Sequence, residues 1–576
     1  MLELKAVQYT LQRDEADLHL LNDVSLNVKP GHFMAIVGPS GCGKTTLLKV
    51  IAGLQLETSG QILWRGEDVS EGGDIKPQEL GYVPQFSIAF DHLTVEECVE
   101  TAAKLRTRAS GDELYDITDR VIAEVGMENS RAKRVSVLSG GQKRRLGLAM
   151  ELVSQPTLLL CDEVTSGLDP QGERDIVQLL HSLSLKDDRI VVNVTHSLMN
   201  LDLYDSVLVM YEGHVVYHGT PDAMPHYFSA DTPVAVYPML AKRKAADWHE
   251  SWLKYRDAYY EKLDQRLIAR PHPAPVPATT EDGAPVAHHD DNHEPPSQLR
   301  QFFVLSGRRW KLFFRDRTQI FLHLALLLGF PILVVIFATN GMPAMPELNV
   351  PDTLEGMKAR AQNVEKQVEI GGLISGLVMF QVILLTLMGS NNSAREIAGE
   401  RLTYEKERLG GMAPMAYLAS KIGFLAVLVA AQSIWMGIFV NHFTELPGGL
   451  GEKIKMLLLV NGAMTAVCLA ISANMKSPEQ ASLLSIYLVG FQLPLSGAVL
   501  ALPGALEKIV QPLIAAYWSW SGQLSTMRTS DYFVAVNQAV PTEIVSTTGS
   551  STAILSAHIL CGLVAAWIGC KRHRWD

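Results

Sequence analysis

The chain has 576 residues, of which 47% are hydrophobic and 19% are charged, and its formal net charge is −11. The charged fraction is lower than the roughly 25% of an average soluble domain, which argues against a wholly soluble protein, while the apolar content excludes a mainly disordered or collagen-like chain. The acidic balance argues against nucleic acid as a partner. Six cysteines without a CxxC pair are too few for a disulfide framework.

Residues 1–240 have the pattern of a mixed α/β domain. Short apolar runs at 33–38, 158–162 and 190–195 predict buried parallel strands, and the segment 206–219 predicts a hairpin that turns at Glu212-Gly213. The start of the chain has no apolar stretch typical of a signal peptide, so we expect this domain to lie in the cytosol.

Residues 241–298 predict a helix followed by a linker. Aromatic residues recur at three- and four-residue spacing in 247–268, which indicates a helix that packs one face on the domain. The stretch 270–296 is rich in Pro, Ala, Asp and His, so we interpret it as a flexible linker rather than a metal site. Residues 299–317 alternate aromatic and basic residues and predict an amphipathic connecting helix at the cytosolic membrane surface.

From residue 318 to 576 the pattern is that of an all-α membrane domain. Seven stretches lack Asp, Glu, Lys and Arg, and a membrane span needs about 20 mostly apolar residues. A cytosolic N-terminal domain and the basic end at 571–574 require an even number of spans. We interpret 509–527 as a re-entrant or outward-facing short helix. Six spans then remain, at about 319–338, 370–392, 418–440, 454–474, 480–501 and 551–570.

The loop before the second span carries Lys358, Arg360 and Lys366, which counts weakly against placing it outside. We keep that placement because the parity argument requires it.

A phosphate-binding motif follows the first predicted buried strand. Residues 38–46, GPSGCGKTT, match G-x-x-x-x-G-K-[ST]. Glycines in this motif let backbone N–H groups surround phosphate oxygens at a helix N-terminus. Lys44 is expected to reach the β- and γ-phosphates, and the Thr45 hydroxyl to bind Mg²⁺. The predicted nucleotide-binding residues are Gly38, Ser40, Gly41, Gly43, Lys44, Thr45 and Thr46.

Further motifs follow in a fixed order. They are Gln85 in YVPQF, LSGGQ at 138–142, LLLCDE at 158–163, SGLD at 166–169 and His196. Together with the phosphate loop, this set resembles the ATP-binding cassette (ABC) family, of which LSGGQ is the signature. The resemblance implies ATP and Mg²⁺ as cofactors and an ABC-type ATPase activity.

The resemblance also implies a role for individual residues. Asp162 would hold Mg²⁺ with Thr45 and Gln85, and Glu163 would be the general base for the attacking water. His196 would contact the γ-phosphate. The signature residues would face ATP bound to a second cassette, and they are Ser139, Gly140, Gly141 and Gln142.

One cassette per chain means that two chains must meet to complete two sites. Tyr9 would stack on adenine, although Leu11 is a competing alignment.

The order of cassette, linker and six spans resembles the white (G) subfamily of half-transporters and bacterial type-2 exporters. AMELV at 149–153 is similar to the subfamily's G-M-E-L-I, and the segment 395–412 would rest on the cassettes and transmit their movement. A substrate cavity would lie between the second and fifth spans at the dimer axis. By this resemblance the candidate contacts are Leu385, Met388, Val489, Gly490 and Leu493.

These expectations converge on an exporter in the plasma or inner membrane, with the ATPase domain and C-terminus in the cytoplasm. No acid or base lies deep in a span, which favours a lipid or another hydrophobic or amphipathic small molecule as substrate. A glycan or glycolipid exporter, and a nucleotide-regulated membrane protein that does not pump, remain alternatives. The expected partners are a second copy of the chain or a related half-transporter, membrane lipid and the substrate, with no nucleic acid.

Overall fold

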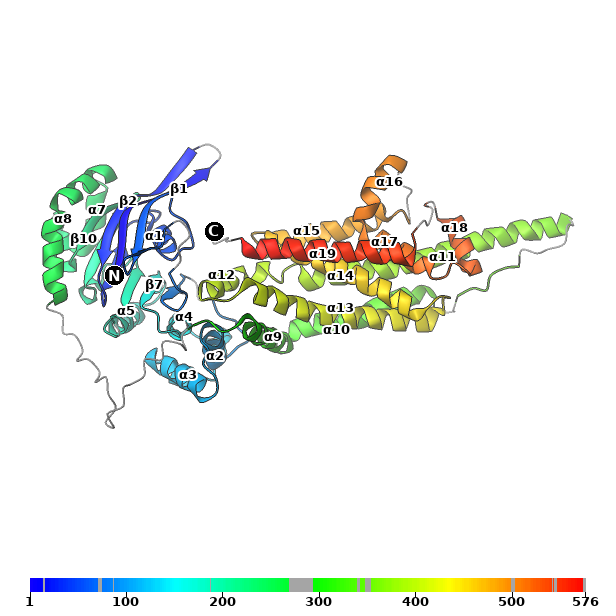
Figure 1. The fold of residues 1–576 in the computed structure, drawn as a ribbon, viewed down its shortest axis with the longest axis horizontal. Coiled ribbons are helices and arrows are strands. Elements are labelled where there is room, and N and C mark those ends of the chain that lie inside the picture. The colour runs from blue at the N-terminus through cyan, green and yellow to red at the C-terminus, as the bar shows by residue number, and fades with distance from the viewer. Residues whose placement is uncertain are drawn as a thin grey trace. The chain divides into compact units, whose positions relative to one another are not determined.

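The computed structural model describes residues 1–13, 16–70, 75–85, 88–186, 188–268, 294–338, 342–347, 354–498, 503–540, 542 and 546–572. These residues form two compact units (Figure 1). The first unit contains residues 1–304 and 405–412, and the second contains 305–404 and 413–572. The His- and Asp-rich run of the predicted linker, at 288–293, lies outside the described residues.

The first unit is built on two sheets. The larger sheet has the strand order β10-β9-β3-β8-β7-β6, in which β3, β6, β7, β8 and β9 are parallel and the β9–β10 hairpin is antiparallel. Its strands are β3 (Phe33–Val37), β6 (Leu80–Val83), β7 (Leu158–Asp162), β8 (Ile190–Val194), β9 (Ser206–Tyr211) and β10 (His214–Gly219). Each predicted strand and the predicted hairpin are therefore confirmed.

The smaller sheet is antiparallel, with the order β2-β1-β4-β5. Its strands are β1 (Leu2–Arg13), β2 (Ala16–Val28), β4 (Ser59–Trp64) and β5 (Glu67–Asp68). Helices pack around the two sheets, and they are α1 (Lys44–Ile51), α2 (Val95–Arg106), α3 (Asp112–Glu124), α4 (Gly140–Leu152), α5 (Pro170–Ser184), α6 (Met224–Tyr227), α7 (Val236–Leu240) and α8 (Ala245–Ile268).

Local sequence sets where several of these helices begin. Thr94 caps α2 and Ser139 caps α4, each through a reciprocal capping box that satisfies backbone N–H groups of the first turn. The predicted aromatic helix is α8, and its Trp248 and Trp252 are buried. Trp252 packs near Tyr217 of β10 with ring centroids 5.6 Å apart, so this helix covers the hairpin edge of the sheet.

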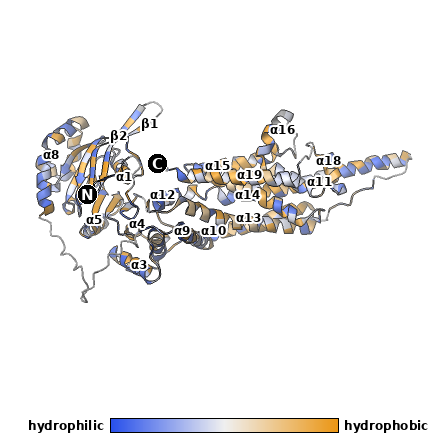
Figure 2. Cartoon of the chain, viewed as in Figure 1, coloured by the Kyte–Doolittle hydropathy of each residue, from blue (hydrophilic) through white to orange (hydrophobic). Residues whose placement is uncertain are grey.

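The second unit is helical. Its elements are α10 (Arg317–Val335), α11 (Leu354–Ser393), α13 (Pro414–Thr444), α14 (Leu450–Asn474), α15 (Pro478–Gln492), α16 (Gly504–Val510), α17 (Ala515–Ser525), α18 (Asp531–Ala539) and α19 (Thr548–Lys571). Two further helices, α9 (Gln298–Arg315) and α12 (Arg401–Leu409), each contribute residues to both units. Figure 2 shows that apolar residues dominate the long helices of the second unit.

Small residues let these helices approach closely. A Cβ at Gly562 of α19 would lie 2.7 Å from the backbone of Ala466 in α14, and a Cβ at Gly371 of α11 would lie 2.1 Å from the backbone oxygen of Ala535 in α18. Van der Waals packing of this kind drives helix association in lipid, because lipid tails are as apolar as the side chains they replace.

Five helices among the described residues are long and apolar enough to cross a membrane, and they begin at Arg317, Leu354, Pro414, Leu450 and Thr548. The fifth predicted span, at 480–501, extends beyond the helix observed there, because α15 ends at Gln492. Pro494 and the left-handed Gly497 (φ 75°) follow and interrupt the helix. Residues 509–527 form short helical segments, and Trp520 of α17 is fully buried in the core of the unit.

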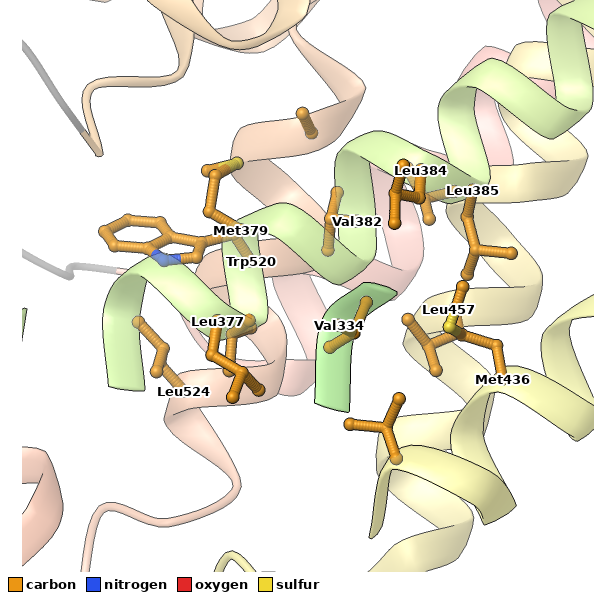
Figure 3. Close-up of a cluster of buried hydrophobic side chains, with 14 of the residues drawn as sticks. Val334, Leu377, Met379, Val382, Leu384, Leu385, Met436, Leu457, Trp520 and Leu524 are labelled. Carbon is orange, nitrogen blue, oxygen red and sulfur yellow. The ribbon is translucent and has the colours of Figure 1, made fainter. Parts of the chain in front are cut away.

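Three of the predicted substrate contacts are buried inside the second unit. Leu385, Met388 and Val489 are at most 4% exposed and belong to the apolar core of the second unit. Figure 3 shows Leu385 in this cluster with Met436 and Leu457. These side chains pack on neighbouring helices of the same chain. The remaining two candidates, Gly490 and Leu493, are exposed.

The connecting helix predicted at 299–317 is observed as α9, but some of its basic residues do not lie at a surface. Arg308 and Arg309 are buried. Arg309 donates two hydrogen bonds to the Glu396 carboxylate, at 2.6 and 2.9 Å. Lys421 lies 3.1 Å from the same carboxylate. This part of α9 is therefore held inside the second unit by ion pairs.

Candidate functional site

The phosphate loop joins β3 to α1. Gly38 and Gly43 have φ values of 152° and 101°. A Cβ at Gly38 would lie 2.2 Å from the Met210 backbone oxygen, and one at Gly43 would lie 2.5 Å from that of Leu20. Only glycine satisfies both the conformation and the space at these positions. The backbone of this tight loop thus lies at the N-terminus of α1, where phosphate binds favourably.

Lys44 is the first residue of α1 and its side chain folds back over the loop. Its Nζ donates to the backbone oxygens of Gly38 and Pro39, at 2.9 Å each. The side chain is 4% exposed, so the ammonium group is held directly above the loop. Ser40 and Gly41 are exposed at the rim of the loop, and Thr46 lies half-buried in the first turn of α1.

Two acids lie at the carboxyl end of β7, as predicted, since Asp162 is its last residue and Glu163 follows it. The hydroxyl of Thr45 donates to the Asp162 carboxylate at 2.9 Å. Burial raises the pKa of Asp162, and the neighbouring Glu163 carboxylate raises it further, while the Thr45 hydrogen bond opposes the shift. A buried pair of acids beside a hydroxyl is a site that gains from a divalent cation.

Glu163 is held by the two residues that the motif order places beside it. Gln85 follows β6 and donates through Nε2 to Glu163 Oε2 at 2.7 Å. His196 follows β8, and its Nε2 lies 2.5 Å from Glu163 Oε1. Since β6, β7 and β8 are neighbouring parallel strands, their carboxyl ends meet at one edge and bring the three side chains together. Glu163 itself has a left-handed backbone (φ 49°), a strained conformation typical of functional sites.

The signature loop at 139–142 makes its hydrogen bonds locally. Gln142 N donates to Ser139 Oγ at 3.3 Å, Ser139 N donates to Gln142 Oε1 at 3.0 Å, and Gln142 Nε2 donates to Ser130 Oγ at 3.3 Å. Ser139 and Gly140 are exposed, and Gly141 is partly exposed. The exposed start of α4 therefore presents backbone N–H groups to the outside of the unit.

Tyr9 lies in β1 and pairs in register with Leu21 of β2. The neighbouring Leu20 contributes the backbone oxygen that approaches Gly43. Tyr9 is half-buried, and Leu11 pairs with Leu18 further along the same ladder. Tyr9 thus lies on the strand next to the one that touches the phosphate loop, while Leu11 lies further from it.

The structure adds two tyrosines that the motifs did not indicate. The Tyr82 hydroxyl in β6 hydrogen-bonds the Asp162 carboxylate, and burial followed by that acid raises the Tyr82 pKa. Tyr237 of α7 hydrogen-bonds the backbone of Gly38 and lies 3.4 Å from the His196 backbone oxygen. Burial raises the pKa of Tyr237 to about 12, so the phenol stays protonated as a donor. Residues 233–240 carry no motif, so no sequence signal identified Tyr237.

Two family models match the chain. The model described as ABC transporter matches residues 21–166, and the model described as ABC-2 type transporter matches residues 300–521. The first match contains the phosphate loop, the signature loop and both acids. The second covers α10, α11, α13, α14 and α15.

Curated relatives match both halves. An ABC transporter ATP-binding/permease protein of Mycobacterium tuberculosis is 30% identical over 537 residues, which are 91% of this chain and 57% of that protein. An ABC transporter G family member of Arabidopsis thaliana is 31% identical over 301 residues, 52% of this chain and 50% of that protein. A sulfate/thiosulfate import ATP-binding protein of Brucella melitensis is 34% identical over 275 residues, 46% of this chain and 76% of that protein. The chain thus spans about half the length of the first two.

Proposed function

The chain belongs to the ABC transporter family, and from this premise we propose that it is one half of an ATP-driven exporter that works with a second copy of itself. One observation carries the proposal. A phosphate loop with Asp162, Glu163, Gln85 and His196 around it lies in the same chain as a signature loop whose hydrogen bonds are local and whose start is exposed. In a pair of copies, the signature loop of each copy would face ATP bound at the phosphate loop of the other.

The nucleotide site fits Mg·ATP. Thr45 and Asp162 would hold Mg²⁺ together with phosphate oxygens, with Gln85 nearby. Within the described part of the chain, no group of three or more His, Cys, Asp or Glu side chains gathers to hold a metal ion. Mg²⁺ prefers one or two carboxylates plus the phosphates of its substrate, and Asp162 would supply a carboxylate. Bound Mg²⁺ would neutralise charge on the phosphates during transfer.

Glu163 is placed to accept a proton from the attacking water. Both of its carboxylate oxygens are hydrogen-bonded, one to Gln85 and one to His196. These contacts restrict the rotamer of Glu163, and an oriented base needs less rearrangement when the water arrives. Ser139 and the following backbone N–H groups would bind the γ-phosphate of ATP on the other copy.

The second unit offers a cavity for the substrate. It has a volume of about 470 Å³, within the range of small-molecule sites. It is lined by Gly372, Ser375, Gly376, Met379, Phe380, Ile383, Leu493, Ala498, Ala539 and Val540. Ser375 is the one polar side chain in this lining. A glycan would need many hydrogen-bond partners, so an apolar or amphipathic substrate fits this lining better.

Of the predicted contacts, Leu493, just after α15, lines this cavity, and Gly490 in α15 is exposed. The α11 contribution shifts from Leu385 and Met388 to residues 372–383. We place the ATPase unit and the C-terminus on the cytoplasmic side, because the basic residues 571–572 end α19.

The experiment measures ATP turnover of the full chain in nanodiscs with lipids, hydrophobic drugs and a soluble polysaccharide. We expect stimulation by a lipid or hydrophobic compound, and loss of that stimulation in Gly376→Trp. A Cβ at Gly376 meets no atom within 4 Å, so the indole can enter the cavity without moving the backbone. Gly423→Trp is the matched control, because Gly423 in α13 also has open space but does not line the cavity.

Stimulation by the polysaccharide alone would favour the glycan exporter. Ionic current without ATP turnover would favour the nucleotide-regulated alternative.

A further inference from the structure

The helix α11 is much longer than a membrane span. Its 40 residues correspond to about 60 Å at 1.5 Å per residue, twice the roughly 30 Å of a bilayer core. The charge-free part begins at residue 370, and residues 354–369 carry six charged side chains. We call residues 354–369 the outer extension. Figure 2 shows the change from apolar to polar colouring along α11, and Figure 1 shows this end of α11 projecting beyond α13 and α19.

One face of the outer extension is apolar and exposed. Leu354, Met357, Val364 and Val368 are 74%, 66%, 40% and 36% exposed, and Ala361 between them is also exposed. Their spacing of three, four, three and four residues is the a/d repeat of a coiled coil. In water, such a stripe of apolar side chains marks an interaction surface.

The opposite face of the outer extension is covered by the same chain. Asn363 Nδ2 donates to the Glu347 backbone oxygen at 2.8 Å. Gln367 is 4% exposed, and Gly356 is buried. Gly371, the next d position after Val368, packs against the backbone of Ala535 in α18, so the exposed stripe ends at Val368. Within residues 354–368, the contacts named above lie away from the a/d stripe.

We propose that the a/d stripe of the outer extension pairs with the same stripe of a second copy, as a parallel two-helix coiled coil outside the membrane. This inference rests on the proposed homodimer, because it needs the second copy. In an exporter with its two-fold axis along the membrane normal, equivalent helices run parallel. The stripe would therefore meet its own equivalent in register.

The charges at the positions that flank the stripe fit pairing with the same helix of a second copy. With Leu354 and Met357 at a and d, Arg360 falls at g and Glu365 at e of the next heptad. In a parallel coiled coil a g residue lies beside the e residue five positions further along the partner helix. Arg360 would therefore pair with Glu365 of the partner subunit, and symmetry would create this ion pair twice.

The exposed face continues into the membrane part of α11. A Cβ added at Gly372 or Gly376 would have no other atom within 4 Å, and Leu387 is 40% exposed. At 100° per residue, Gly372 and Gly376 lie within about 40° of Leu354 around the helix axis, while Leu387 lies about 60° from it. Gly372 and Gly376 also line the proposed substrate cavity. Pairing of the outer extensions would thus hold the two cavities toward one another and close their outer end.

The test is oxidative cross-linking of the full chain in native membranes. Cys561 is the one exposed cysteine among the described residues, so Cys561→Ser is the background. Single cysteines replace Ala361, Val364 and Val368 on the stripe, with Ala359, Asn363 and Lys366 as controls on the other side of the same helix. Copper–phenanthroline is the oxidant that converts two thiols into a disulfide.

We expect stripe positions to give about tenfold more disulfide-linked homodimer than the controls, because a disulfide needs Cα atoms within about 7 Å. Adding Arg360→Glu to Val364→Cys should reduce its cross-linking, and adding Glu365→Arg as well should restore it.

Several results would overturn the outer pairing. One is equal cross-linking at stripe and control positions, and another is cross-linking between Met357→Cys and Val368→Cys instead of between identical positions. The others are a disulfide-linked product with a different protein, and a charge swap that does not restore the cross-linking of Val364→Cys. ATP turnover is measured on the same membranes. ATP turnover without stripe-specific cross-linking rejects the coiled coil and leaves the proposed exporter intact. Absence of both ATP turnover and stripe-specific cross-linking rejects the coiled coil and the exporter.

Discussion

A buried ion triad in the first unit offers a sharp prediction about stability. Glu151 of α4 lies between two cations, with Arg106 of α2 at 2.7 Å and Lys406 at 3.0 Å. Their side chains are 1%, 7% and 3% exposed, respectively. Glu151 Oε2 also accepts from the Tyr82 backbone N–H at 3.3 Å, and the Tyr82 hydroxyl binds Asp162. The triad therefore connects the segment 405–412 to the strand that carries the nucleotide site.

The perturbation is Glu151→Gln, which keeps the volume and removes the charge. Breaking a buried pair from one side costs about 3–5 kcal/mol, because the remaining charge stays buried without compensation. Here two cations lose their counter-charge, so we expect the upper part of that range. For a domain of about 150–250 residues, 1 kcal/mol lowers Tm by about 2–4 °C, so the expected fall is about 8–20 °C.

The assay is scanning calorimetry of the full chain in nanodiscs, following the transition that Mg·ATP shifts upward, since ligand binding marks the nucleotide-binding unit. Glu100→Gln is the matched control. It also removes a carboxylate from a lysine pair, at 2.6 Å from Lys104, but both side chains are about one-third exposed. That change should cost less than about 1 kcal/mol. If Glu151→Gln lowers Tm no more than Glu100→Gln does, the triad does not stabilise the unit and our reasoning is wrong.

Two further predictions concern the same unit. Burial alone raises the pKa of Glu151, but Arg106 and Lys406 outweigh it and hold the pKa below its ordinary value of 4.5. Because a lowered folded-state pKa stabilises above the unfolded value, the Tm gap between wild type and Glu151→Gln should stay constant from about pH 5 to 8 and shrink as pH falls below 4.5. A gap that shrinks near neutral pH would contradict this assignment. Glu163→Gln should retain ATP binding in a filter assay and lose at least about 100-fold in turnover, as expected for a general base; near-normal steady turnover would show that another group takes the proton.

Much of the nucleotide site was predictable because its chemistry is local in sequence. The phosphate loop, the acids after LLLC and the residues Gln85 and His196 each follow a strand. The carboxyl ends of neighbouring parallel strands lie at one edge of the sheet, so these residues meet there. In the structure, Gln85 and His196 both contact Glu163. Tyr82 and Tyr237 were not predictable, because their contacts depend on how β6 and α7 pack, and neither belongs to a spaced motif.

In the membrane half, less of the structure was predictable from the sequence. Charge-free stretches alone were enough to predict that long apolar helices cross a membrane, because charged groups are costly in a bilayer. They did not indicate which face of α11 points inward, since lipid and protein interior are equally apolar and leave no polar–apolar contrast along the helix. Leu385 and Met388 face the core, while Gly376 and Ile383 line the cavity, because neighbouring helices set the rotation of α11. Sequence alone therefore determined the nucleotide chemistry and the membrane character, and only tertiary packing decided which residues of α11 line the cavity.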